Sequence, residues 1–143
     1  MKNKKWYVIS TFVLGCIVVN FAGRILSDRL QLPLWLDSFG TVTAAYVLGP
    51  FCAAMVGMTV NLTYGILYSW TNMFYAVVSA MVGITTGICV KKGFLKNLYG
   101  VLSTSFLVAV LSVTLSVPLN YLYCDGSTQN IWGDGVIESM EKV

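Results

Sequence analysis

The 53 residues from Ser38 to Val90 contain no charged side chain. A continuous helix of that length would extend about 80 Å, whereas the hydrocarbon core of a bilayer is about 30 Å thick. The segment must therefore fold back on itself at least once. Two places interrupt its apolar pattern: Gly49-Pro50, where proline lacks a backbone donor, and the polar residues 69–72.

Two further uncharged stretches, residues 6–23 and 97–124, are long enough to cross a bilayer. The sequence is 57% hydrophobic and only 10% charged, far from the balance of a water-soluble domain. A cleavable signal peptide competes for the N-terminal run, but that run is too long and lacks a convincing cleavage site. We therefore predict an all-α membrane protein, a bundle of transmembrane helices in one domain over residues 1–143. The expected spans are 6–26, 34–49, 51–68, 73–90 and 98–121.

Lysines at two places indicate how the helices are oriented. Three precede the first span within residues 2–5, and three follow the fourth span within residues 91–96. Short basic loops stay cytoplasmic, and only an even number of crossings puts both groups on that side. A reversal at Gly49-Pro50 gives four crossings, whereas a kinked single helix gives three. We therefore expect a reversal there, in a multi-pass protein of the cell membrane with a cytoplasmic N-terminus.

This orientation places residues 27–37, 68–72 and 120–135 on the outer side. Asp37 is expected at or near the external interface, where water reaches it and where it can cap the second helix. Residues 122–143 form an external tail that is rich in turn-forming residues. Five spans with such a tail look unfinished, and we expect a sixth helix beyond it.

Several kinds of chemistry are excluded by residue types and motifs that the sequence lacks. It has no histidine, which rules out histidine-based acid-base, triad and metal chemistry. Its four cysteines form no C-x-x-C pair, and we interpret them as packing residues. It has no phosphate-binding loop with a Walker lysine, so it cannot itself hydrolyse ATP. We expect no enzyme activity, no metal or other cofactor, and no nucleic-acid partner.

The polar residues near the outer side suggest a pocket, but each has an alternative explanation. Asn61 lies inside a span, and an interhelical hydrogen bond explains it as well as a ligand contact does. The small residues spaced by four between 79 and 87 are interpreted as helix packing. Arg24 can extend to the interface, pair with Asp28 or attract an anion, and we favour extension to the interface. Tryptophan and tyrosine gather at membrane interfaces whether or not they bind a ligand.

Two segments, LPLWLDSFGTVTAAYVLGPFCAAMVGMTVNLTYG (32–65) and VPLNYLYCDGSTQNIWGDGV (117–136), carry a family resemblance. Residues from about 20 to 138 resemble the substrate-binding S components of energy-coupling factor (ECF) transporters, in particular a group without an assigned substrate. The Gly-Pro turn after the family's second helix matches Gly49-Pro50, and a polar position in its third helix fits Asn61. The resemblance implies six helices with both termini cytoplasmic, and loops one, three and five closing over a substrate near the outer face.

The resemblance also implies partners and a function. Such a subunit binds a small molecule outside the cell and releases it inside, together with a transmembrane coupling subunit and two ATPase subunits. We expect a vitamin-like or nucleobase-like substrate, because aromatic rings and amides suit such molecules, whereas nickel and cobalt lack histidine ligands here. The alternative is a membrane-embedded ligand-sensing module of a signalling protein, and a purely structural membrane protein is a third class.

The candidate substrate-binding residues come from the outer segments and from the third span. Tryptophans would stack on the substrate, asparagines would read its hydrogen-bonding edges, and aspartates would bind a cationic group or cap a helix. The set is Trp35, Asp37, Asn61, Tyr64, Asn72, Asn120, Trp132 and Asp134.

Overall fold

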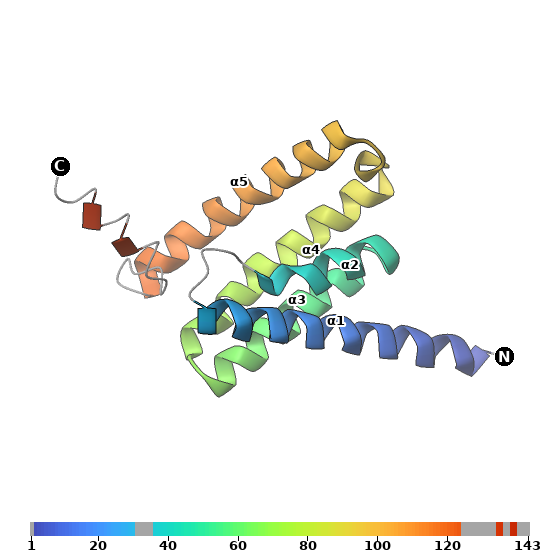
Figure 1. Cartoon of the computed structure of the whole chain (residues 1–143), viewed down its shortest axis with the longest axis horizontal. Helices are drawn as coiled ribbons and strands as arrows, with labels where there is room; N and C mark the ends of the chain where they lie inside the picture. The colour runs from blue at the N-terminus through green and yellow to red at the C-terminus, as the bar shows by residue number, and fades with distance from the viewer. Residues whose placement is uncertain (1, 31–35, 124–133, 136–137, 140–143) are drawn as a thin grey trace.

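A computed structural model describes residues 2–30, 36–123, 134–135 and 138–139 of the chain. The elements in these ranges are all helical, as predicted (Figure 1). In chain order they are α1 (Lys2–Leu30), η1 (Leu36–Ser38), α2 (Phe39–Val47), α3 (Pro50–Leu67), η2 (Trp70–Met73), α4 (Tyr75–Lys91), η3 (Phe94–Lys96) and α5 (Leu98–Tyr123), where η marks a 3-10 helix.

Four helical segments of the described residues are long and apolar enough to cross a membrane. They are Lys5–Leu30, Pro50–Leu67, Trp70–Lys91 and Leu98–Tyr123. α2 is not among them, because its nine residues extend only about 14 Å. The coarser prediction of a multi-pass helical bundle is thus supported, but a complete crossing by the predicted span 34–49 is not.

The chain nevertheless reverses at Gly49-Pro50, as the sequence predicts. Gly49 has φ +93° and ψ −178°, a backbone conformation that suits glycine, and Pro50 occupies the first turn of α3. α2 and α3 therefore run antiparallel and pack together (Figure 1). The helices α2, α3 and α4 each reverse the direction of the helix before, so the start of α1 and η3 lie at the same end of the bundle. We call this the η3 end, and the opposite end the η2 end.

Small residues bring the helices into close contact. A Cβ atom on Gly83 of α4 would lie 2.7 Å from the backbone carbon of Ala53 in α3, and one on Gly87 would lie 2.5 Å from Pro50. These approaches confirm the packing role that the four-residue spacing predicts. Large apolar side chains point outward instead: Phe51 and Phe106 are 77% and 73% exposed, as expected for lipid-facing positions.

A buried amide fixes the start of α2 against the middle of α1. Asn20 is 0% exposed; its Nδ2 donates to Thr41 Oγ1 at 2.9 Å, and its Oδ1 accepts from the Gly40 backbone N–H at 2.5 Å. Gly40 in turn lies so close to the backbone of Cys16 that no larger residue fits there. With α2 held in this register, η1 packs beside the C-terminal part of α1, and Asp37 comes next to Arg24.

Candidate functional site

Arg24 lies at the centre of a polar cluster toward the η2 end. Its Nη1 donates to Asp37 Oδ2 at 3.2 Å and to Asn61 Oδ1 at 3.4 Å, and its Nη2 donates to Asn72 Oδ1 at 2.6 Å. The side chains of Arg24 and Asp37 are only 15% and 10% exposed. The prediction that Arg24 extends to the interface is therefore wrong, because a carboxylate and two amides satisfy its guanidinium inside the bundle.

The position of Asp37 also differs from the prediction. Its carboxylate was expected to face water or to cap the second helix, but it pairs with Arg24. Ser38 is the residue that precedes α2, and it makes no side-chain capping bond; its hydroxyl lies 3.5 Å from Asp37 Oδ1. The charge of the arginine explains this outcome, since pairing two charges is the least costly way to bury either one.

Asn61 connects the cluster to α4. Its Nδ2 donates to Ser79 Oγ at 2.6 Å and to the carbonyl oxygen of Gly57 at 3.2 Å, while its Oδ1 accepts from Arg24. Asn72 similarly uses its Nδ2 on the carbonyl oxygen of Ser69 at 3.3 Å. Both amides therefore hold the guanidinium in place, which is the interhelical role that the sequence left open for Asn61.

Tyr64 covers one face of the guanidinium. Its ring centroid lies 4.6 Å from Arg24 Cζ, a cation–π contact, and its hydroxyl donates to the carboxylate of Asp28. Tyr68 stacks on the same ring with centroids 4.5 Å apart, and Phe21 contacts it edge-on. The cation is thus enclosed by a carboxylate, two amides and an aromatic ring.

A cavity of about 340 Å³ opens beside this cluster, among α1, η1, α3, α4 and α5. Its volume falls within the range of small-molecule sites. Arg24, Asp37 and Asn61 line one part of it, and four valine and alanine side chains, Val78, Val82, Ala109 and Val113, line another. Hydroxyl groups complete the lining, on Ser38, Tyr75, Ser79, Ser112 and Ser116. The arrangement can orient a polar group at one end and cover an apolar group at the other.

Four of the predicted site residues come together here, and two that the structure describes do not. Asp37, Asn61, Tyr64 and Asn72 surround Arg24, whereas Asn120 does not line the cavity and accepts a hydrogen bond from the Tyr75 hydroxyl. Asp134 is half-buried and does not line the cavity. Trp35 and Trp132 lie outside the described residues.

The serines of α5 were not predicted. Ser112 and Ser116 are four residues apart, so both face the cavity from one side of the helix. Their spacing is a signal that the sequence does contain, although small polar residues spaced by four also occur in ordinary helix packing. Ser112 makes no side-chain hydrogen bond within the described part of the chain, which leaves its hydroxyl available to a ligand.

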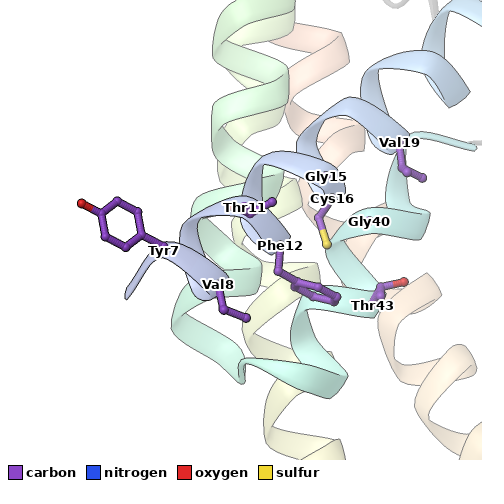
Figure 2. Close-up of a pocket in the computed structure, with 9 residues that line it drawn as sticks. All are labelled: Tyr7, Val8, Thr11, Phe12, Gly15, Cys16, Val19, Gly40 and Thr43. Carbon is purple, nitrogen blue, oxygen red and sulfur yellow. The ribbon is translucent and has the colours of Figure 1, made fainter. Parts of the chain in front are cut away.

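A second hollow lies beside α1 and has different chemistry. This groove of about 660 Å³ runs between α1 and α2, and Figure 2 shows Phe12, Cys16 and Thr43 among the side chains along it. Its described lining is mostly apolar and contains no charged residue. Such a surface suits lipid chains or another helix better than a polar ligand, so the cavity beside Arg24 is the candidate site.

The described residues contain no group of three His, Cys, Asp or Glu side chains that could hold a metal ion. Neither a known protein family, nor a curated protein, nor a solved structure matches this chain.

Proposed function

We propose that this chain is the substrate-binding membrane subunit of an ECF-type uptake transporter. It captures a small vitamin-like or nucleobase-like molecule from the external side and delivers it inward with a transmembrane coupling subunit and two ATPase subunits. The observation that carries the proposal is the cavity of about 340 Å³ beside the Arg24–Asp37 ion pair.

The cost of the ion pair supports a functional role. Ionisable residues inside a membrane domain are expensive, face the interior or a cavity, and commonly mark a substrate or ion pathway. Here the pair is nearly buried and lines a cavity large enough for a small molecule. The pair also connects helices, but its position in the lining of such a cavity favours binding over a purely structural role.

The charge pattern supports uptake from outside. Lys5, Lys91, Lys92 and Lys96 lie at the η3 end, whereas the cavity lies toward the η2 end. With the basic end in the cytoplasm, the cavity is nearer the external face. A substrate would then enter past η1 and η2, the elements that carry Asp37 and Asn72.

The first test is to purify the protein from membranes and identify small molecules that co-purify with it by mass spectrometry. We expect one organic compound at close to one molecule per chain. The purified compound, added back, should raise the unfolding temperature of ligand-free protein, since a ligand that binds only the folded state stabilises it.

A matched pair of serine variants locates the binding site. Ser112 lines the cavity and Ser105 is exposed on the same helix. Because Ser112 has no hydrogen bond to lose within the described residues, Ser112→Ala should leave folding intact and weaken binding of the compound by about 3- to 10-fold. Ser105→Ala should not change the affinity. Equal affinities for the two variants would place the ligand elsewhere.

Measuring whether the same compound accumulates in host cells distinguishes uptake from sensing. We expect isotope-labelled compound to accumulate only when the chain is present and the cells are energised. Binding without accumulation would support the ligand-sensing alternative. No bound compound and no stabilisation by any candidate would leave only a structural role.

A further inference from the structure

The described residues that line the cavity beside Arg24 carry no net charge. Among them, Arg24 and Asp37 are the charged ones, and they pair with each other at 3.2 Å. The other described lining residues are one asparagine, four serines, the tyrosine at 75, and aliphatic side chains. A ligand with a net charge would therefore enter a largely apolar space without a counter-charge, and an uncompensated buried charge is strongly unfavourable.

The polar end of the cavity offers both hydrogen-bond donors and hydrogen-bond acceptors. Asp37 offers carboxylate oxygens, Arg24 uses three of its five N–H groups in the contacts described above, and Ser112 offers a hydroxyl. A head group that both donates and accepts hydrogen bonds can use all three. A group that only accepts hydrogen bonds, such as a carboxylate, would face the like charge of the Asp37 carboxylate across the cavity.

The deeper part of the cavity is aliphatic. α4 and α5 run in opposite directions, so Val82 and Ala109 lie farther from the η2 end than Tyr75 and Ser116 do. Tyr75 is the one aromatic residue of the described lining, and its hydroxyl is engaged by Asn120. The described wall thus suits a compact aliphatic group.

We propose, on the basis of the function proposed above, that the substrate is a small molecule of zero net charge. Its head group carries both a hydrogen-bond donor and an acceptor, as an amide or a zwitterionic amino acid does, and lies against the Arg24–Asp37 pair. Its aliphatic part lies against Val82 and Ala109. The balance of charge in the cavity excludes simple anions and cations of the same size.

Four five-carbon probes test this charge rule on the full chain in detergent. Pentanamide is neutral, 2-aminopentanoate is zwitterionic, pentanoate is an anion and pentylammonium is a cation. We expect pentanamide or 2-aminopentanoate to raise the unfolding temperature of the wild-type protein, and the two ions to leave it unchanged.

A charge substitution should reverse the preference. Asp37→Asn keeps the size and an acceptor oxygen but leaves the Arg24 charge uncompensated, so the affinity for pentanoate should rise about tenfold or more relative to pentanamide. Glu138→Gln also removes one negative charge and is the matched control, since Glu138 is exposed and does not line the cavity. It should leave the wild-type preference in place.

The charge of the co-purified compound gives a second measurement that needs no variant. A compound of zero net charge supports the substrate class even if Asp37→Asn does not fold. A co-purified anion or cation, or wild-type stabilisation by pentanoate or pentylammonium equal to that by pentanamide, would overturn the substrate class while the proposed function stands. Absence of any bound compound together with no response to any probe would overturn both.

Discussion

Arg24 of α1 donates a 2.6 Å hydrogen bond to the amide oxygen of Asn72, which lies 48 residues later in η2. The contact joins the C-terminal part of the first helix to the turn between α3 and α4. Asp37 and Asn61 bind the same guanidinium, so four elements that are far apart in the sequence depend on one side chain. Its removal should therefore affect stability as well as binding.

We expect Arg24→Gln to lower the free energy of unfolding by about 3 kcal/mol, because it leaves the Asp37 carboxylate nearly buried without its partner. Arg29→Gln is the control: Arg29 is exposed on the same helix, and its loss should cost no more than about 0.5 kcal/mol. Denaturant unfolding in mixed micelles measures both. The double variant Arg24→Gln/Asp37→Asn should recover part of the loss. If Arg24→Gln and Arg29→Gln had the same free energy of unfolding, the ion pair would contribute nothing to folding.

Asn20→Ala should destabilise the protein by about 1 to 2 kcal/mol, since the fully buried amide bonds both Thr41 and the Gly40 backbone. Thr41→Val removes only one of those bonds and should cost less. Thr43→Val, at an exposed position of the same helix, serves as the control and should have little effect. If Asn20→Ala unfolds at the same denaturant concentration as Thr43→Val, the amide does not fix the register of α2.

A glycine pair tests the close approach of α3 and α4. A Cβ on Gly83 would lie 2.7 Å from the Ala53 carbonyl carbon, whereas a Cβ on Gly15 would meet nothing within 4 Å. Gly83→Ala should therefore cost about 1 to 3 kcal/mol in unfolding free energy. Gly15→Ala should be neutral or stabilising, because alanine favours helix over glycine by up to about 1 kcal/mol. A larger loss of unfolding free energy for Gly15→Ala than for Gly83→Ala would contradict this close packing of α3 and α4.

Thiol labelling tests the orientation in the membrane. In a variant without the four native cysteines, Trp70→Cys at the η2 end and Lys92→Cys near the η3 end each place one exposed thiol. A membrane-impermeant maleimide added to intact cells should label the residue at 70, and should label the residue at 92 only after permeabilisation. If the cysteine at residue 70 were labelled only from the cytoplasmic side, the orientation would be the opposite one, and the support for uptake would be lost.

The sequence predicted helix boundaries well because they depend on local properties. The predicted spans 51–68, 73–90 and 98–121 lie within a few residues of α3, α4 and α5, since apolar length and turn-forming residues bound each helix. The reversal at Gly49-Pro50 followed from the same kind of signal together with the lysines. The second predicted span, 34–49, has a shorter helical part among the described residues, since η1 and α2 cover only residues 36–47. Its start is fixed at the middle of α1 by the bonds of Asn20 to Gly40 and Thr41, a tertiary contact that apolar length does not predict.

The candidate site was predicted in part. Sequence reasoning selected Asp37, Asn61, Tyr64 and Asn72, four polar residues that lie together in the fold. It did not predict that Arg24 connects them, because an arginine near a helix end extends to the interface unless partners inside the bundle offer compensation. Their role in binding stays a prediction.

The sequence by itself determined that the chain forms apolar helices, where most of them begin and end, and where it turns back. These features follow from residue hydrophobicity and from the backbone preferences of glycine and proline. Only the tertiary structure decided that Arg24 turns inward. That choice depends on a carboxylate and two amides from three other elements, and the free energy of burying a charge is set by the groups around it.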